Sequence, residues 1–458
     1  MQANTRHALY APQPATNVAR KRVRKTLNAD ALFQLVRQDF REIADHRAAN
    51  TRIPLDDALM SALAMFQLKD PSLLAFDQRR IDDAGNLKAL FGITVVPCDS
   101  QLRTVLDPLP LAVLRSPFRS VFRALQRGKD FEKMAYYDGH YLLSCDGTGF
   151  YSSDKVSSPY CLSKKTKNGT TLYYQQMYAA AFVHPDNKVV IPVCPEMITK
   201  QDGTKKQDSE QAAAKRFFRE FRREHPHLPV IVVEDALSSN GPHIRELQQL
   251  RLRFLLGAKP ADHVHLFSQL DQATADHTAT EIEYLDSENR RIGHFFRFKN
   301  GLSLNQSNTD LLVNVLEYWQ IDSNENIVKF SWITDIEITR GNVHQLMRAG
   351  RARWKIENET FNTLKNQGYH LEHNFGLGKK NLSAVFTTLM MLAFLIDQAQ
   401  QLSCWLFQAA LARKRRKRYL WEDIRSFYRM FEVDSMETIL RAIAFDHGKQ
   451  PFTGTGQT

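Results

Sequence analysis

Apolar residues recur at helical spacing over residues 31–130, between short polar breaks. Leu32, Val36 and Phe40 lie about one turn apart, as on the buried face of an amphipathic helix. The run Asp70-Pro71-Ser72 then marks a new helix start. We therefore expect an N-terminal helical domain here. It suits either a DNA-binding module or a helical cap on the main domain, and the pattern favours neither.

The pattern changes over residues 131–257 to apolar runs typical of strands. Residues 228–233 are apolar almost without interruption, which is typical of a strand buried on both faces of a sheet. The predicted order is three strands, a helix, a strand, a helix and a strand, at residues 141–146, 173–183, 189–193, 208–223, 228–233, 243–250 and 252–256. This alternation predicts an α/β fold.

Residues 258–340 break the alternation and predict a β-rich insertion, with strands at residues 281–285, 292–298, 311–317 and 327–333. Its tryptophans, Trp319 and Trp332, are expected in the core, with base stacking as the alternative. Residues 341–402 return to helices. We expect one helix capped by Asn342 and ended by Gly368. A buried core helix should follow at 382–402, because its apolar run is too short to span a bilayer.

Both ends of the chain are basic. Residues 1–30 are polar with cations clustered at positions 20–25, which predicts a flexible basic arm. Residues 403–458 form a basic C-terminal helical region, and positions 413–418 are six consecutive cations. Each cluster either contacts a DNA backbone or is simply solvated.

Three acidic residues stand out by their positions. Asp146 ends the first predicted strand and Asp235 follows the buried one, at the strand ends where open α/β sheets place their sites. Glu357 lies on the later helix, with Arg353 one turn before it on the same face and Lys365 two turns after it. Carboxylates that converge need a cation, and their hard oxygens suit Mg²⁺ or Mn²⁺. Taken singly, the aspartates are equally explained as turn caps, and the helix as an ordinary ion-paired face.

The net charge and the cysteines indicate which kind of partner and compartment to expect. The net charge is +11 and the pI about 9.3, which favours a polyanionic partner, nucleic acid first. The five cysteines are odd in number and form no CxxC pair, so we expect a reducing compartment without disulfides. A zinc site built from Cys161, Cys194 and His184 is an alternative use. The first residues lack the apolar core of a signal peptide, so a cytoplasmic protein without a membrane partner is expected.

The acidic residues lie in segments that resemble the DDE transposases of bacterial insertion sequences, in the cut-and-paste group with a Tyr-Arg-Glu-Lys signature. The resemblance covers roughly residues 95–400. It rests on CDGTGFYSS at 145–153, VEDA at 233–236, NGP at 240–242, GRARWKIE at 350–357, and KQDSE at 206–210 with the AKR at 214–216. Gly350 stands where the family has tyrosine. Leu364 stands where it has lysine, and Lys365 is one place later.

This resemblance implies a ribonuclease-H-like catalytic domain interrupted by the β-rich insertion. It implies that Asp146, Asp235 and Glu357 are catalytic residues that bind Mg²⁺ or Mn²⁺, and that Arg353 and Lys365 are DNA-binding. The expected function is a transposase that cleaves double-stranded DNA at insertion-sequence ends and joins the 3′-hydroxyl ends to target DNA, as a homodimer in the synaptic complex. The alternatives are a non-catalytic, sequence-specific DNA-binding protein and a metal-dependent DNA nuclease.

Overall fold

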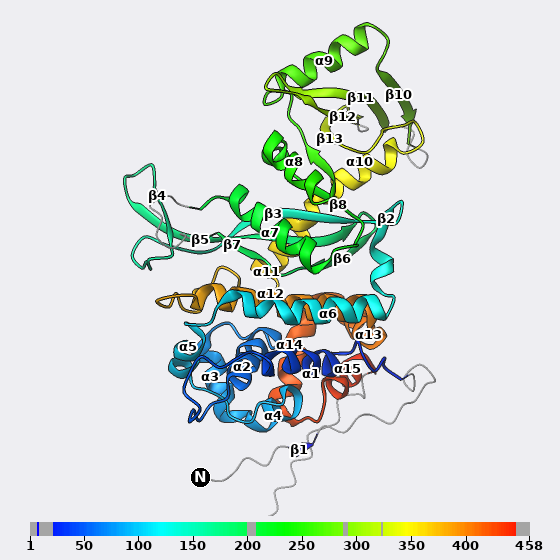
Figure 1. The fold of residues 1–458 in the computed structure, drawn as a ribbon. Coiled ribbons are helices and arrows are strands. Elements are labelled where there is room, and N and C mark those ends of the chain that lie inside the picture. Colours follow the sequence, from blue (N-terminus) through cyan, green and yellow to red (C-terminus); the bar gives the residue numbers. More distant parts are fainter. Residues whose placement is uncertain (1–6, 9–21, 199–207, 287–291, 322–323, 446–458) are drawn as a thin grey trace, which may run out of the picture.

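The computed structural model describes residues 7–8, 22–198, 208–286, 292–321 and 324–445. A mixed β-sheet runs through the upper part of the molecule, and a layer of helices built from both ends of the chain lies below it (Figure 1). The protein is therefore mixed α/β, as the alternating pattern predicts.

Four neighbouring strands form the part of the sheet on which the candidate site depends. β3 (His140–Ser153) pairs antiparallel with β5 (Thr171–His184) and parallel with β8 (Val230–Glu234), and β8 pairs parallel with β9 (Arg253–Gly257). Every residue of β8 is buried, as its unbroken apolar run predicts. Shorter strands border this group: β2 (Ala135–Tyr137), β4 (Leu162–Lys165), β6 (Asn187–Pro192) and β7 (Glu196–Ile198).

The prediction that the first strand ends at Asp146 is wrong. β3 continues to Ser153 because β5 pairs with it along this whole length. Its parallel pairing with β8 stops much earlier, at Ser144 and Val233. Asp146 therefore lies just beyond the point where β8 stops pairing with β3, near the loop that follows β8.

Two helices follow strands of this central group, and both begin with a side-chain cap. Ser209 accepts a hydrogen bond from the backbone of Ala212 and starts α7 (Glu210–Glu224), which buries Phe217, Phe218 and Phe221. Asn240 does the same for α8 (Gly241–Gln249). Capping of this kind satisfies backbone N–H groups that the first turn leaves free. The short turn η3 (Ala236–Ser238) joins β8 to α8.

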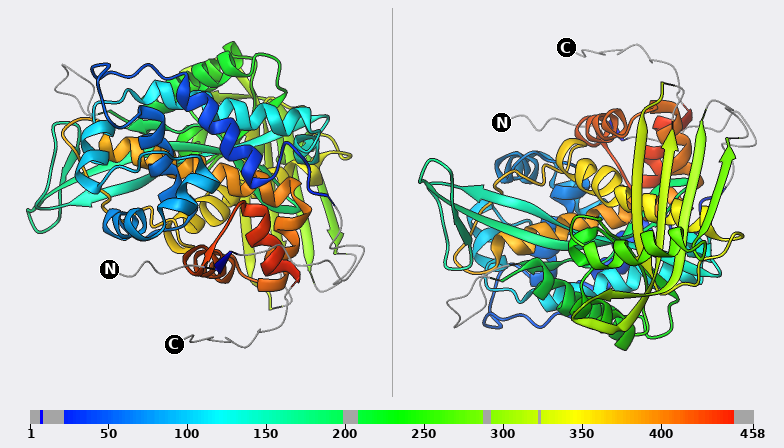
Figure 2. Two further views of the ribbon diagram at one scale, coloured as in Figure 1. Left: turned by 90° about the horizontal axis from the view of Figure 1, so that it is seen from below. Right: turned by 90° about the horizontal axis from the view of Figure 1, so that it is seen from above.

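The sheet continues beyond β9 through the predicted β-rich segment. β13 (Ile327–Thr334) pairs with β9, and β12 (Asn308–Ile321), β11 (Gly293–Asn305) and β10 (Thr280–Leu285) follow outward. The helix α9 (Val264–Ala275), which the pattern did not predict, packs on β11. Trp332 is buried, as expected of a core aromatic, whereas Trp319 is half-buried beside Lys329. Figure 2 shows these long strands side by side at one side of the molecule.

The lower layer is organised around α12 (Leu382–Ser403). This helix is long and apolar enough to cross a membrane, yet 94% of its most apolar stretch is buried inside the protein, as expected of a core helix. Helices from both termini surround it: α1 (Ala29–Arg41), α2 (Leu55–Gln67), α3 (Leu73–Asp82), α4 (Ala84–Phe91), α5 (Asp99–Leu106), η1 (Leu111–Leu114), α6 (Arg115–Arg127), η2 (Phe131–Met134), α13 (Trp405–Lys414), α14 (Lys417–Met430) and α15 (Met436–Phe445).

The basic ends of the chain are partly engaged within the protein. β1 (His7–Ala8) pairs with β14 (Phe431–Glu432). Arg24 forms an ion pair with Asp130, while positions 20 and 21 of the predicted cluster lie outside the described residues. The cations at 413–418 do not share one helix face, because Arg415 has a left-handed backbone (φ 62°) and separates α13 from α14.

Candidate active site

The helix that carries Glu357 is broken into four pieces rather than continuous. It runs as α10 (Val343–Arg351), a 3₁₀ turn η4 (Ala352–Trp354), a π turn η5 (Ile356–Phe361) and α11 (Asn362–Asn366). Gly368, with φ 102°, follows its end as predicted.

Asn342 occupies the N-cap position of α10, as predicted, but its side chain makes no capping bond. Instead the Asn342 amide donates to the hydroxyl of Tyr137 at 3.0 Å and to the carbonyl of Glu337 at 2.9 Å, and its oxygen accepts from the backbone of Thr339. These competing partners draw the side chain back towards the segment that precedes the helix.

Arg353 joins Asp146 to Glu357. Its Nη1 donates to Glu357 Oε1 at 2.8 Å and lies 3.5 Å from Asp146 Oδ2. The alternation of side chains along a strand explains the approach. Ser144, two residues before Asp146, donates its hydroxyl to the carbonyl of Arg353 at 2.9 Å, so this face of β3 is the one turned towards the broken helix.

Asp235 lies on the loop that leaves β8. Its Oδ1 accepts from the backbone of Leu237 at 2.9 Å and caps η3. The neighbouring Glu234 is buried and already occupied: it accepts from the hydroxyl of Tyr178, and its other oxygen is 2.6 Å from His243 Nε2. Glu234 is thus held by buried hydrogen bonds beneath the site. Asp235 is the residue of this pair whose charge raises the pKa of Asp146.

Glu210, which sequence reasoning did not select, is a fourth carboxylate at this place. It is the first residue of α7 and lies against Gly147, so closely that a Cβ on Gly147 would be 2.3 Å from its Oε2. Burial raises the pKa of Glu210, and the charges of Asp235 and Glu234 raise it further. The signal available in the sequence was Gly147 itself, because the absence of a side chain there is what admits the carboxylate.

The negative charge of the carboxylates at this site exceeds the positive charge close to them. Burial raises the pKa of Asp146 to about 7; the backbone of Gly147 and the charge of Arg353 oppose this shift, and Glu210 and Asp235 add to it. A bound cation would relieve the excess. The donors are all carboxylate oxygens, which suit Mg²⁺ or Mn²⁺.

The carboxylates do not form a closed metal cage. Within the part of the chain that the structure describes, no three His, Cys, Asp or Glu side chains stand close enough together to hold a metal ion. This holds for Asp146, Asp235 and Glu357, between two of which Arg353 is interposed, and equally for Cys161, Cys194 and His184. The donor chemistry fits a divalent ion, with the acidic residues near one another rather than already gathered around one point.

Lys365 lies on α11 and pairs with Glu372 at 2.8 Å, so its ammonium is directed to a different partner from that of Arg353. A π turn takes in one more residue than an α-helical turn, and η5, which carries Glu357, therefore changes the position of Lys365 relative to Glu357.

The match to a protein family covers this region. The family model described as "Transposase DDE domain" matches residues 139–395, which include Asp146, Glu210, Asp235, Arg353, Glu357 and Lys365. No curated protein matches the chain. Among solved structures, the chain has a low likeness to the "Cryo-EM structure of piggyBac transposase synaptic complex with hairpin DNA", with a TM-score of 0.39 and 10% identity over 93% of this chain and 82% of that one.

Proposed function

The chain belongs to the transposase DDE domain family, whose model spans residues 139–395, and we propose that it cleaves DNA at insertion-sequence ends and joins the freed 3′-hydroxyl ends to target DNA. The observation that carries this proposal is the convergence of acidic side chains from three separate elements. Asp146 on β3 is reached by Arg353 from the broken helix, which also holds Glu357, and it senses the charge of Asp235 after β8.

We propose Asp146, Asp235 and Glu357 as the catalytic carboxylates and as ligands of Mg²⁺ or Mn²⁺. When bound, such ions supply charge neutralisation and activate the attacking oxygen of a phosphodiester displacement. The chain's own part is positioning. Asp146 is fixed by β3, Asp235 by its capping bond to Leu237, and Glu357 by Arg353. Phosphoryl transfer depends on such positioning more than on covalent participation by the protein.

The strand arrangement supports a ribonuclease-H-like core. β5, β3, β8 and β9 are neighbours in that order, with the first pair antiparallel and the next two parallel. β10–β13 then form the β-rich insertion between Asp235 and Glu357. We infer that the protein acts on double-stranded DNA in a bacterial cytoplasm, and that two copies meet in the synaptic complex.

Substitution of the acidic residues tests the catalytic assignment. Asp146→Ala, Asp235→Ala and Glu357→Ala should each abolish cleavage and strand transfer on plasmid DNA carrying the element's ends, while mobility-shift assays show end binding largely unchanged. Glu359→Ala, two residues from Glu357 in the same π turn, is the matched control and should stay active. Loss of end binding, with normal cleavage by whatever remains bound, would refute the catalytic role.

The same assay separates the alternatives. A DNA nuclease would release cleaved ends without strand-transfer products, and a non-catalytic DNA-binding protein would give neither. Asp235 follows directly after another acidic residue, Glu234, and Asp235→Asn against Glu234→Gln tests which of the two is catalytic. We expect the Asp235→Asn variant to fold but to lose DNA cleavage, and Glu234→Gln to lower stability because it disturbs the bonds to Tyr178 and His243.

We also propose that the helices of residues 31–130 help to recognise the element's ends. Deleting them is unsuitable as a test, because α2 and α6 pack on the core helix α12. Neutralising exposed cations one at a time, as in Arg52→Gln, Lys88→Gln and Arg127→Gln, keeps the core intact. At least one should weaken end binding and its salt dependence. End-specific affinity unchanged in all three would argue against recognition by this surface.

A further inference from the structure

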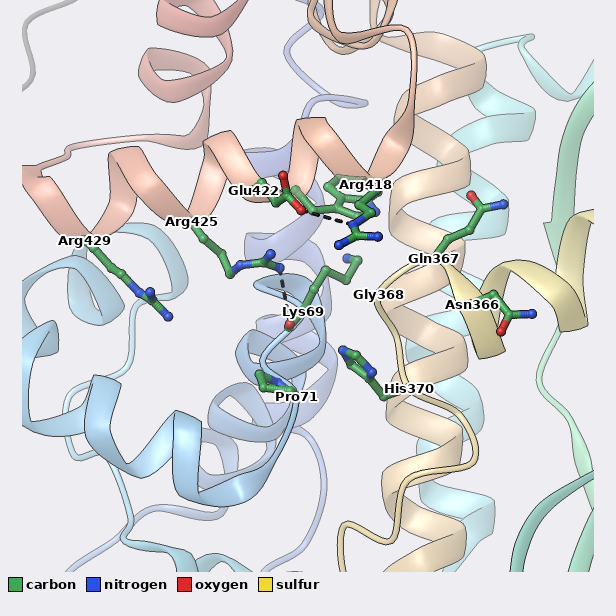
Figure 3. Close-up of a pocket in the computed structure, with 11 residues that line it drawn as sticks. Lys69, Pro71, Asn366, Gln367, Gly368, His370, Arg418, Glu422, Arg425 and Arg429 are labelled. Carbon is green, nitrogen blue, oxygen red and sulfur yellow. Dashed lines mark hydrogen bonds and ion pairs between the residues drawn. The ribbon is translucent and has the colours of Figure 1, made fainter.

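A cationic pocket lies where the broken helix ends. Its cavity of about 490 Å³ is lined on one side by Asn366, Gln367, Gly368 and His370, and on the other by α14. Figure 3 shows the side chains of α14 facing Lys69 and Pro71 across this space. Three parts of the chain that are distant in sequence therefore meet here: the end of α2, the end of α11 and the whole length of α14.

Positive charge dominates the wall formed by α14. Arg418, Arg425 and Arg429 are seven and four residues apart, a spacing that puts them on one face of the helix. Glu422 is the one carboxylate on this wall, and it pairs with Arg418 at 3.1 Å. The charge of Arg425 and Arg429 is not cancelled by that pair.

Arg425 and Arg429 form no ion pair with a carboxylate among the described residues. Arg425 donates there to the carbonyls of Leu68 and Lys69, over 3.5 and 3.3 Å. Burial lowers its pKa; the charge of Asp70 opposes this shift, and that of Arg429 adds to it. Arg429 is exposed, and among the described residues it has no ion pair with a carboxylate. Lys69 does not share this role, because Asp397 holds its buried ammonium at 2.7 Å.

Trp421 lines the same wall and is only 3% exposed. The ammonium of Lys69 lies over its ring, 4.3 Å from the ring centre, so the aromatic side chain packs behind the cationic wall. The guanidinium groups of Arg425 and Arg429 suit a ligand that brings several oxygens and negative charge, as a phosphate does.

We propose that this pocket binds a backbone phosphate of the DNA on which the protein acts, with Arg425 and Arg429 as the charged donors. This inference rests on the proposed function. The position is suitable, because Glu357 and Asn366 are nine positions apart in one short helical segment made of η5 and α11. The pocket therefore lies close along the chain to the candidate catalytic carboxylates.

Salt-dependent binding of duplex DNA by the full-length protein tests the pocket. Arg429→Gln removes one charge that has no structural partner, and Arg429→Glu reverses it. Arg223→Gln on α7, an arginine that is similarly exposed, is the matched control. We expect Arg429→Gln to weaken affinity several-fold and to make the slope of log K against log salt shallower by about 0.9, the value for one lost phosphate contact. Arg429→Glu should weaken affinity more, and Arg223→Gln should leave the slope unchanged.

Thermal unfolding shows that each variant is folded. An unchanged slope in both Arg429 variants, with wild-type protein binding DNA normally, overturns the pocket while leaving the proposed function intact. Failure of the wild-type protein to bind DNA at all overturns the proposed function instead. Inorganic phosphate is the second probe. If phosphate raises the melting temperature of the wild-type protein but not of Arg429→Glu, while the two proteins bind DNA with the same slope of log K against log salt, the pocket binds a free anion rather than DNA.

Discussion

Gly350 lies directly against the indole ring of Trp332. A Cβ on this glycine would be 2.4 Å from the ring atom Cε2, closer than any side-chain carbon can come. Trp332 is buried on β13 and stacks on Phe330 with ring centres 5.7 Å apart, so it cannot easily give way. A larger side chain at position 350 is therefore excluded for a steric reason, since the indole occupies the space.

This contact predicts an unusual result for a helical glycine. Gly→Ala inside a helix ordinarily stabilises a protein by about 0.5–1 kcal/mol. Gly85→Ala on α4 should do so, because nothing lies within 4 Å of its added Cβ. Gly350→Ala should instead destabilise by about 1–3 kcal/mol, the usual cost of overpacking. Urea unfolding of both variants measures this, and equal stabilisation of the two would contradict the contact.

Glu210 is predicted to act with the catalytic carboxylates. Glu210→Gln keeps the shape of the side chain beside Gly147 but removes a charge that raises the pKa of Asp146. We expect the Mg²⁺ concentration needed for half-maximal cleavage to rise on the order of ten-fold, the lower range for groups around a metal site. End binding should be unchanged.

The control for this prediction lies on the same helix. Glu220→Gln removes a charge from α7 that pairs with Arg223 at the surface, and it should leave the Mg²⁺ requirement as it is. A Mg²⁺ requirement of Glu210→Gln equal to that of the wild type would exclude a direct part for this carboxylate.

The sequence predicts the parts of the fold that depend on apolar periodicity. The buried strand β8 and the core helix α12 were found almost to their ends, because their apolar runs are long and have one interpretation. The length of β3 was missed, since pairing with β5 decides it rather than the residues around Asp146. α9 was missed because its apolar positions, Leu266, Phe267 and Leu270, stand among polar residues in a region otherwise read as strands.

The candidate site could likewise be predicted only in part. Position along the elements made Asp146, Asp235 and Glu357 candidates, although Asp146 does not end its strand, and helical spacing was enough to pair Arg353 with Glu357. Glu210 was missed because its approach to Asp146 depends on the packing of α7 against the sheet; Gly147 leaves room for it, but the glycine alone does not indicate which side chain fills that room. The π turn was also invisible, since it changes the hydrogen bonds of the helix and not the kind of residues in it.

His225 predicts a loss of stability in mild acid. It ends α7 between the rings of Phe122 and Phe221, at 4.6 and 5.0 Å. Burial lowers its pKa to about 4, against the raising effect of Glu224 and with help from Arg115. The unfolded chain therefore binds a proton between pH 6.5 and 4 that the folded protein does not. Stability should fall as the pH drops through this window, by on the order of 3 kcal/mol from this residue.

Urea unfolding at pH 7, 5 and 4 measures this effect. Other groups titrate in the same range, so the difference between variants is the informative quantity. His225→Gln should be less stable than the wild type at pH 7, because it loses the ring contacts, and this gap should narrow or close by pH 4. His227→Gln, an exposed histidine two residues away, should follow the wild-type profile. A constant gap between His225→Gln and the wild type would show that His225 titrates normally.

We predict that Arg353 binds a DNA phosphate in addition to its pairing with Glu357. Among the described residues, its hydrogen bonds to Asp146 and Glu357 both use Nη1, which leaves the other nitrogens of the planar group available. Its guanidinium lies 4.7 Å from the ring of Trp354, which favours one orientation. Such a fork can bind two phosphate oxygens at once, whereas lysine offers only a point charge.

Arg353→Lys separates the two roles of this residue. If Arg353 only pairs with the carboxylates, lysine preserves the charge, and cleavage should fall no more than a few-fold. If it clamps a phosphate, cleavage and strand transfer should fall by about 1.5–3 kcal/mol of transition-state stabilisation, the usual worth of a charge-assisted bond, or roughly 10- to 100-fold in rate. We expect the second result, with normal thermal unfolding. Arg351→Lys, which changes an exposed arginine bonded to Gln320, should stay near wild-type activity, and near wild-type transposition by Arg353→Lys would falsify the clamp.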